Sequence, residues 1–220
     1  MWVDFHTHKV IPFGVVGVQN IDNPKGLLLS DRMETGSMYS IGLHPWDIVD
    51  NAWSITFDII AQIAFNKSIK AIGECGFDKF KGDKTEQRTA FQKHIELSEK
   101  LKLPLIIHNV GGDNDVWFFH KKERPLQPWI IHSFIGNTQI AKEFAKRNIF
   151  CSFSPSSLQN PRTIEAFKHY PPHLTFLETD DTTTSSEVVY SLASSILERD
   201  IEILKDLYYN NFKTLFKLND

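Results

Sequence analysis

Short apolar runs alternate with longer amphipathic stretches along most of the chain. Runs of this length that are rich in aliphatic and aromatic residues are typical of buried strands. The runs are "WVDFH" (2–6), "FGVVGVQN" (13–20), "MYSIGLH" (38–44), "IKAIGEC" (69–75), "LPLIIH" (103–108), "PWIIHSF" (128–134), "NIFCSFS" (148–154) and "LTFLETD" (174–180). Since parallel strands need crossovers of about a dozen residues, usually helical, the alternation predicts a parallel sheet.

Apolar residues recur at helical spacing between these runs. The predicted helices cover residues 52–66, 85–102, 138–147 and 162–169, and two more lie within 185–217 and meet near Arg199–Asp200. Thr85 is expected to cap the second helix, and Pro161 stands near the start of the fourth. The connection from Lys9 to Phe13 is too short for a helix, and residues 20–37 are expected to form a loop with at most a short helix.

Eight strands alternating with helices predict an α/β fold, a (β/α)8 barrel of the TIM type that is slightly trimmed in its first connections. A chain of 220 residues suits such a barrel as a single domain over residues 1–220. An open doubly wound sheet is the alternative, but no G-x-G-x-x-G motif follows the first run. Barrel enzymes carry their chemistry at the carboxyl ends of the strands, so those ends are the place to look for a site.

Composition narrows the class of protein further. An apolar fraction of 41% supports a sizeable core, and a net charge of −3 argues against broad attraction to polyanions. Cys75 and Cys151 make no disulfide framework, and no apolar run approaches the ~20 residues of a membrane span. With no signal peptide in view, we expect a cytoplasmic protein without a membrane segment and without an obligate protein partner.

Side chains of the metal-ligand type stand at or near the ends of the predicted strands. They are His6, His8, His44, Glu74, His108, His132, Glu178 and Asp180. Each histidine taken alone is more readily a hydrogen-bonded structural residue, but imidazoles that converge on one barrel end need a cation to offset desolvation and repulsion. The four other histidines lie on predicted helices or loops and are expected to be solvated: His94, His120, His169 and His173.

Nitrogen and carboxylate donors without cysteine suit Zn²⁺, Mn²⁺ or Ni²⁺ and are too rich in nitrogen for a dedicated Ca²⁺ or Mg²⁺ cage, although Mg²⁺ stays among the candidate ions. The set exceeds what one tetrahedral ion needs, so we expect two divalent ions. A bridging carboxylate would hold them ~3.5–4 Å apart, and Glu74 is the natural bridge. Such a centre activates water near neutral pH.

Several motifs carry a family resemblance. They are "VDFHTH", "IGLHPW", "AIGECGFD", "EQRTAFQKHIELSEKLKLPLIIH", "IIHSFIG", "CSFSP", "FLETDD" and "NNFKTLF". In this order, from residue 3 to about residue 216, the chain resembles the TatD-type metal-dependent hydrolases, which belong to the amidohydrolase-like barrels. The resemblance implies hydrolysis of phosphodiesters, chiefly DNA, with divalent metal.

The resemblance also implies roles for individual residues. It gives the metal ligands as His6, His8, Glu74, His108, His132 and Asp180. Glu74 would bridge the ions, Asp180 would also orient or deprotonate the attacking water, and His44 would lie near the substrate phosphate rather than on a metal. Asp180, Glu74 and His44 are therefore the predicted catalytic residues.

The rim of the predicted site departs from the family pattern. "HNVGGDND" after the fifth strand lacks the arginine common in the family, and "DTTTSS" after Asp180 lacks the usual proline. The candidate substrate-binding residues are His44, Trp46 and Lys79. Lys81, Lys84 and Arg88 could also contact phosphates. The alternative is a solvated charged loop, because Asp78, Asp83 and Glu86 are interleaved with these cations.

Three functions stay open on the sequence. The first is a metal-dependent phosphodiesterase or deoxyribonuclease, with DNA or a small phosphate ester as substrate. The second keeps the metals but hydrolyses a small amide, lactone or phosphate ester; the PHP phosphoesterases also begin with H-x-H, though their further pattern fits less well. The third is a non-catalytic barrel that binds a partner.

Cys75 should point away from Glu74 along the strand, and we interpret it as buried packing.

Overall fold

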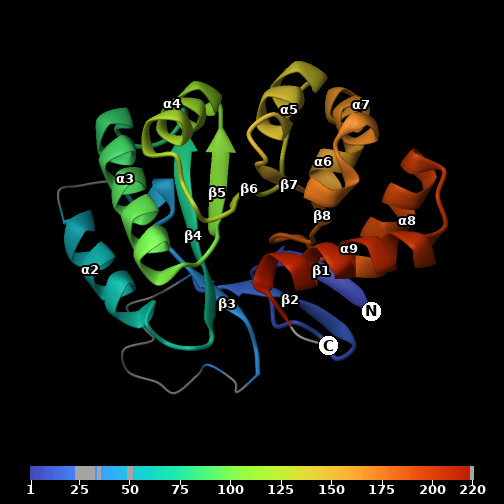
Figure 1. Ribbon diagram of the computed structural model, residues 1–220, viewed down its shortest axis with the longest axis horizontal. Coiled ribbons are helices and arrows are strands. Elements are labelled where there is room, and N and C mark those ends of the chain that lie inside the picture. The colour runs from blue at the N-terminus through green and yellow to red at the C-terminus, as the bar shows by residue number, and fades with distance from the viewer. Residues whose placement is uncertain (23–32, 34–35, 49–51, 219–220) are drawn as a thin grey trace. The chain divides into compact units, whose positions relative to one another are not determined.

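The computed structural model describes residues 1–22, 33, 36–48 and 52–218. Its strands are β1 (Trp2–Thr7), β2 (Val15–Asn20), β3 (Tyr39–Ile41), β4 (Ile69–Asp78), β5 (Leu105–Val110), β6 (Trp129–Ile131), β7 (Phe150–Phe153) and β8 (Thr175–Leu177). They follow one another in chain order through a single 8-stranded sheet, labelled in Figure 1. All eight predicted strands are confirmed, and parallel pairing in chain order is the topology of a TIM-type barrel.

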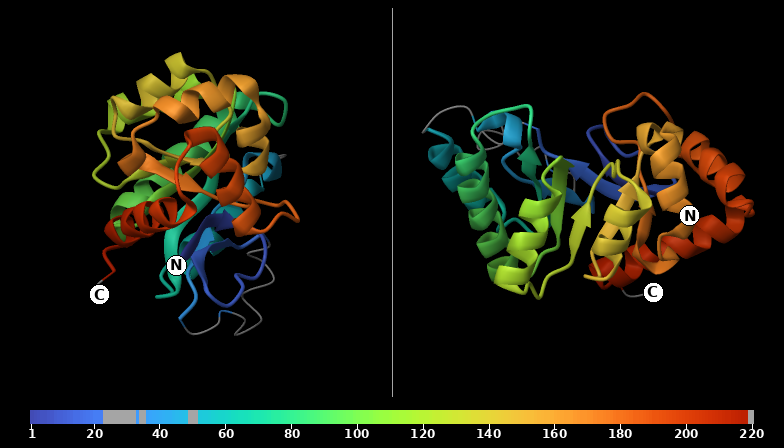
Figure 2. Two further views of the ribbon diagram at one scale, coloured as in Figure 1. Left: turned by 90° about the vertical axis from the view of Figure 1, so that its right-hand side faces the viewer. Right: turned by 90° about the horizontal axis from the view of Figure 1, so that it is seen from above.

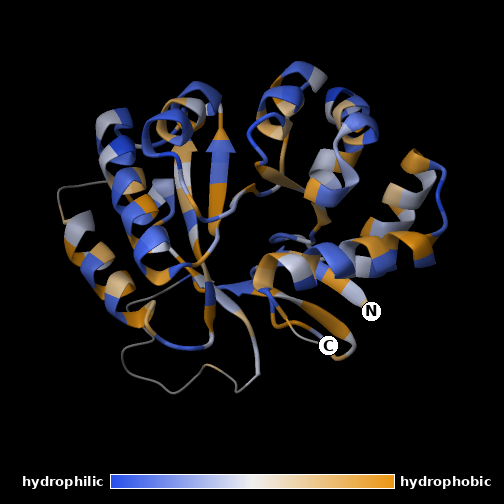
Figure 3. Ribbon diagram, viewed as in Figure 1, coloured by the Kyte–Doolittle hydropathy of each residue, from blue (hydrophilic) through white to orange (hydrophobic). Residues whose placement is uncertain are grey.

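Helices follow most of the strands. They are α2 (Trp53–Ile63), α3 (Lys84–Leu101), α4 (Asp113–Glu123), α5 (Thr138–Ala145), α6 (Pro155–Gln159), α7 (Pro161–His169), α8 (Ser186–Leu197) and α9 (Ile201–Phe216), with single 3₁₀ turns η1 (Pro45–Asp47) and η2 (Pro172–Leu174). In Figure 3 the helices carry both hydrophobic and hydrophilic residues, as expected of elements with one buried face. The predicted helices are confirmed, including the break near Arg199–Asp200.

The differences from the sequence predictions are local. The prediction that Thr85 caps α3 is wrong, because the side chain of Asp83 accepts hydrogen bonds from the backbone N–H groups of Thr85 and Glu86. Helices α4 and α6 were not predicted, since α6 has only 5 residues and the apolar residues of α4 are consecutive, Val116 to Phe119, rather than at helical spacing. Most of the predicted loop over residues 20–37 lies outside the described residues.

Contacts between Cα atoms divide the chain into two compact units, so the expectation of a single domain stays a prediction. Unit 1 comprises residues 1–18 and 130–220. In it, α9 packs against β1 and β8, as Figure 1 shows. The rings of Phe5 on β1 and Phe176 on β8 stack with centroids 4.5 Å apart. The Tyr190 hydroxyl of α8 also accepts a hydrogen bond from the N–H of Val3. These contacts hold β1 beside β8, although the two strands are far apart in sequence.

Unit 2 comprises residues 19–129. Its long helix α3 packs against β4 and β5, and Figure 2 shows α2, α3 and α4 on the same side of these strands. Phe91 on α3 contacts Phe77 on β4 and Phe119 on α4. This aromatic cluster fixes the helices against the strands that carry the candidate functional residues of this unit.

Among the described helices, none combines the length and the apolar composition that a membrane span requires.

Candidate metal centre

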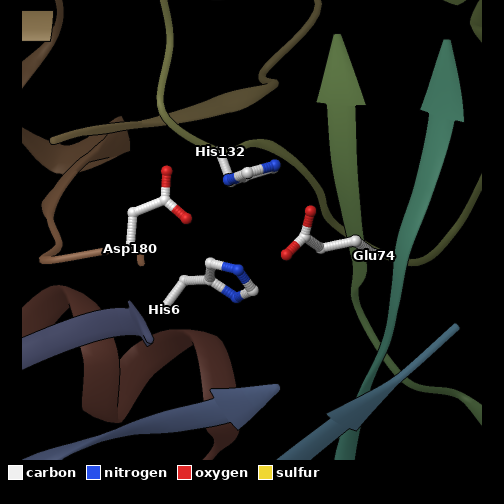
Figure 4. A group of neighbouring side chains, drawn as sticks. All are labelled: His6, Glu74, His132 and Asp180. Atoms are coloured by element: carbon white, nitrogen blue, oxygen red, sulfur yellow. The ribbon is translucent and has the colours of Figure 1, made fainter. Parts of the chain in front are cut away.

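In unit 1 three predicted metal ligands come together. His6, His132 and Asp180 each offer a ligand atom, and these atoms lie within 4.8 Å of one another. Figure 4 shows the polar ends of these three side chains directed toward the same space; Glu74, the fourth side chain drawn, belongs to unit 2. The rings of His6 and His132 have centroids 4.8 Å apart. Two imidazoles and a carboxylate at this spacing form a donor set that suits a divalent transition metal.

The backbone around Asp180 explains how its side chain reaches the histidines of β1. The N–H of Asp180 donates to the carbonyl of His6, and the carbonyl of Asp180 accepts from the N–H of His8. Asp180 has a φ of 56°, in the left-handed region that aspartate tolerates better than most residues. Asp180 is therefore attached on both sides to the H-x-H segment.

His8 lies at the edge of this group. Its Nε2 is 3.6 Å from Oδ1 of Asp180, and its ring meets that of His6 edge to face, with centroids 5.3 Å apart. His8 is half-buried, whereas His6 is fully buried. The structure thus places both histidines of the H-x-H pair on the side of β1 that faces Asp180.

Asp4, on the same face of β1, anchors the segment that leads to Asp180. Its carboxylate accepts hydrogen bonds from the N–H and the hydroxyl of Thr179, at 2.8 and 2.7 Å. Burial raises the pKa of Asp4 to about 6, although the hydrogen bonds from Thr179 act in the opposite direction. Strand alternation puts Asp4 and His6 on one face of β1, but the partner of Asp4 could not be predicted, because the contact joins β1 to the segment after β8.

In unit 2 the central carboxylate is Glu74, which lies within β4 rather than at its end. The prediction that the strand ends there is wrong, because β4 continues to Asp78 beside β5. From Ile72 to Cys75 the pairing register with β5 shifts, and Glu74 lies in this irregularity. An extra residue in a strand re-aims the side chains around it.

Glycine at position 42 lets β3 continue close to Glu74. A Cβ at Gly42 would stand 2.4 Å from the carbonyl oxygen of Glu74, which no real side chain tolerates. The "IGLHPW" motif therefore needs glycine at this position, so that the chain leading to His44 can pass Glu74.

Two histidines face Glu74 within unit 2. Nε2 of His44 is 3.5 Å from Oε2 of Glu74, and Nδ1 of His108 is 3.9 Å from the same oxygen. One ligand atom from each of these three residues lies within 4.8 Å of the others, so the group has the spacing of a metal site. The structure thus brings together three of the predicted site residues of unit 2: His44, Glu74 and His108.

The tautomer of His44 argues against a place on a metal. Its Nδ1 accepts a hydrogen bond from the N–H of Trp46, so the neutral ring carries its proton on Nε2, the nitrogen that faces Glu74. Binding a cation through Nε2 would need the proton on Nδ1, where it would clash with the Trp46 N–H. His44 is therefore built as a hydrogen-bond donor.

Asp78 does not fit the alternative of a solvated charged loop. It is the buried last residue of β4. Its Oδ2 accepts from the indole N–H of Trp46 at 2.6 Å and lies 3.4 Å from Nε2 of His108. Burial by itself would raise the pKa of Asp78, but hydrogen bonds from Trp46, the Phe80 N–H and His108 together hold it below the usual value.

Aromatic and basic side chains surround the exposed edge of this group. Trp46 is 52% exposed, and the ammonium of Lys81 lies 5.2 Å from its ring. The ammonium of Lys79 lies 4.8 Å from the ring of Phe80, and the stem of Lys79 passes so close to Gly111 that a Cβ there would touch it. Trp46, Phe80 and the two lysines form what we call the aromatic rim.

Two other cations do not belong to the rim. Lys84 and Arg88 both pair with the buried carboxylate of Asp115, and Arg88 also stacks on Phe118 and Phe119. Their charge is offset by that carboxylate, so for these two residues a structural role explains the contacts better than phosphate binding does.

His94 was expected on the surface, and this prediction is wrong. It is fully buried in α3, where Nδ1 donates to the carbonyl of Ala90 and Nε2 accepts from the N–H of Leu43. Burial lowers its pKa to about 4, so the ring is neutral. Because Leu43 directly precedes His44, this bond fixes the segment that carries His44. A histidine among the apolar positions of an amphipathic helix was the available signal.

Cys75 and the histidines His120, His169 and His173 are not among the candidate metal ligands. Cys75 is fully buried with Sγ 3.7 Å from the carbonyl of Ile106, and burial raises the pKa of its thiol well above the ordinary value. The interpretation as buried packing fits these contacts. His169 and His173 are exposed, as expected, and His120 is half-buried.

The TatD-related DNase family matches the chain over residues 3–217. This chain belongs to the TatD-related DNase family. It is 28% identical over 203 residues to YabD of Bacillus subtilis, an uncharacterized metal-dependent hydrolase, covering 82% of this chain and 77% of that protein. It is also 27% identical over 185 residues to the human deoxyribonuclease TATDN3, covering 78% and 67% of the two chains.

A solved structure supports the fold. The crystal structure of the TatD homologue YjjV from Escherichia coli superposes with a TM-score of 0.84 at 18% identity, covering 99% of this chain and 98% of that chain. At this identity the likeness shows the fold, which is a TIM-type barrel. This TatD-family chain is a metal-dependent hydrolase with histidine–carboxylate clusters of the metal-ligand type.

Proposed function

We propose that this TatD-family chain is a phosphodiesterase that hydrolyses DNA with two divalent ions. The observation that carries the proposal is the pair of histidine–carboxylate clusters, His6–His132–Asp180 in unit 1 and Glu74–His108 in unit 2. Their donors are nitrogen and carboxylate oxygen without sulfur, which fits Zn²⁺, Mn²⁺ or Ni²⁺, while Mg²⁺ would be held by the carboxylates.

The family resemblance makes Glu74 the bridging carboxylate of a dinuclear centre and His8 a further ligand beside His6. The barrel class supports this, because a TIM-type barrel gathers the carboxyl ends of its strands at one end. Every proposed ligand except Glu74, which lies within β4, stands at or near such an end. Bound there, the ions would lower the pKa of water and polarise the scissile phosphate.

The chain's own residues divide the remaining work. Asp180, half-buried and held by its backbone to His6 and His8, is placed to orient the attacking water and accept its proton. His44, with its proton on Nε2, is placed to donate a hydrogen bond to a phosphate oxygen. Neither role requires the side chain to change its tautomer or its backbone contacts.

The aromatic rim supports a nucleic-acid substrate. Trp46 exposes a ring whose indole N–H is already bound to Asp78, so its face is held ready for a base to stack. Lys79 and Lys81 lie over aromatic rings, where each ammonium can still reach a phosphate. The name of the human relative, a deoxyribonuclease, points to the same substrate class.

The test is a substrate panel on metal-stripped protein that is reloaded with one ion at a time. It compares labelled single-stranded and duplex DNA, bis-p-nitrophenyl phosphate, p-nitrophenyl phosphate, an acyl amide and a lactone. We expect DNA and the phosphodiester to be cleaved, and the activity to disappear with EDTA and in Glu74→Ala, which also excludes a contaminating nuclease. Turnover of only the amide, the lactone or the monoester would replace this proposal with the small-substrate alternative.

A further inference from the structure

His108 lies between two carboxylates of unit 2. Its Nδ1 is directed at Glu74, 3.9 Å from Oε2, and its Nε2 is directed at Asp78, 3.4 Å from Oδ2. The two ring nitrogens of a neutral histidine are not equivalent, since one carries the proton and the other a lone pair. Which carboxylate takes the proton therefore decides which nitrogen is left to bind a cation.

Asp78 is the better acceptor because its position is fixed from several directions. Oδ1 accepts from the N–H of Phe80 at 2.8 Å, and Oδ2 accepts from the indole of Trp46. The backbone N–H of Asp78 donates to Gln87, whose amide in turn donates to the carbonyl of Asp78. A buried carboxylate held so tightly can fix the orientation of the ring that faces it.

A second histidine–carboxylate pair lies in unit 1, at a separation just beyond hydrogen-bond distance. Nδ1 of His132 lies 3.6 Å from Oε1 of Glu178, and that oxygen also accepts from the N–H of Ser133 at 2.6 Å. Ser133 has a φ of 45°, so the turn directly after His132 adopts the left-handed conformation. Glu178 thus contacts both the ring of His132 and the backbone that follows it.

Glu178 is costly to keep as a purely structural residue. It is almost fully buried, and no donor within the described residues reaches its Oε2. A buried carboxylate oxygen without a hydrogen bond destabilises the folded chain, so such a group calls for an explanation. A cation bound to the other ring nitrogen of His132 would supply this explanation, because its positive charge would attract the carboxylate of Glu178.

We propose that Asp78 and Glu178 are positioning residues, each of which holds the proton of one metal-binding histidine and so selects the ring nitrogen offered to the ion. Asp78 leaves Nδ1 of His108 as the ligand, and Glu178 leaves Nε2 of His132. A carboxylate behind a metal-binding histidine fixes the ring's orientation and raises its basicity. The inference rests on the proposed metal role of these two histidines.

The first test needs no substitution. Long-range ¹H–¹⁵N spectra of the metal-free protein at about pH 8, where exposed histidines are neutral, identify the protonated nitrogen of each ring. We expect the proton on Nε2 of His108 and on Nδ1 of His132. The opposite tautomer at either ring would overturn the assignment for that pair, whatever the variants below show.

The second test measures metal affinity in the whole protein. In Asp78→Asn and Glu178→Gln, titration calorimetry with Mn²⁺ and with Zn²⁺ should show dissociation constants raised by about 10–100-fold. The matched controls are Asp83→Asn, which keeps a good helix cap, and Glu165→Gln, an exposed residue bound only to His169 within the described residues. Wild-type affinity in the first two variants, or an equal loss in the controls, would overturn the proposal.

These tests separate the two proposals. If the wild-type protein binds neither ion, the proposed function fails, and the tautomers still report whether Asp78 and Glu178 hold the two protons. If the wild-type protein binds metal and the two variants bind it equally well, only this inference fails. Should a variant not fold, as circular dichroism would show, the tautomers of the wild-type protein decide.

Discussion

At the level of single residues, Glu74 combines burial with close contacts to two histidines. It is buried, it lies where the register of β4 shifts, and its Oε2 faces His44 and His108. A carboxylate desolvated beside two imidazoles is stabilised when a cation joins them.

Replacing Glu74 by alanine should release at least one ion and abolish turnover, since the proposed bridge is removed. Metal analysis of the purified variant and its activity on bis-p-nitrophenyl phosphate check this. Glu96→Ala, an exposed position on α3, is the matched control. Retention of both ions in Glu74→Ala would remove the bridging role.

Asp180 allows a cleaner substitution, because its backbone rather than its side chain forms the bonds to His6 and His8. Asn tolerates the same left-handed conformation, so Asp180→Asn should fold normally and keep most of its metal. Loss of the proposed proton acceptor should lower kcat by about 10²–10⁴-fold. Steady-state kinetics measure this, with Asp181→Asn as the control. An unchanged kcat would reject Asp180 as the residue that orients or deprotonates water.

At the scale of elements, helix α3 connects packing to the site. It contributes Phe91 to the aromatic cluster of unit 2, Gln87 to the end of β4, and His94 to the segment before His44. The amphipathic pattern predicted the helix. The pattern could not show that one polar residue on it would be fully buried, because that depends on which backbone groups lie opposite.

The buried His94 makes stability depend on pH in a defined direction. Its pKa is about 4 in the folded chain, below the ordinary 6.5, so its contribution is complete above pH 6.5 and is lost as the pH falls toward 4. At pH 5 the loss should be about 2 kcal/mol relative to pH 7.5.

Urea unfolding of metal-free wild-type protein and of His94→Gln at these two pH values measures this contribution. The variant should lose less stability on acidification, since glutamine does not titrate. His169→Gln, at an exposed position, should behave like the wild type. An equal pH dependence in His94→Gln and the wild type would contradict the assignment.

At the scale of the whole molecule, the proposed ligands come from strands that are distant in sequence. His6 and Asp180 are joined by backbone hydrogen bonds across nearly the full length of the chain. Such a ligand set does not exist in the unfolded chain, so metal binding should stabilise the folded state.

Metal removal should therefore lower the melting temperature. An ion present at 100 times its dissociation constant adds about 2.7 kcal/mol to the free energy of unfolding. Thermal unfolding with EDTA and with Mn²⁺ or Zn²⁺ measures the shift, which Glu74→Gln should reduce. An identical melting temperature in all conditions would contradict metal binding to the folded protein.

Local patterns along the chain were enough to predict the order of strands and helices and the residue types at the strand ends. Both follow from local patterns. Apolar periodicity sets the elements, and barrel enzymes carry their ligands at the carboxyl ends of strands such as β1 and β5. The eight strands and the residues His6, His108 and Asp180 could be named on that basis, and the family resemblance pointed the same way.

How those residues are held depends on contacts between distant elements. The register shift at Glu74, the burial of Asp78 and His94, and the pairing of Arg88 with Asp115 each depend on a partner from another element. A polar side chain becomes buried where folding brings it an acceptor or donor, and no local pattern encodes which group that will be.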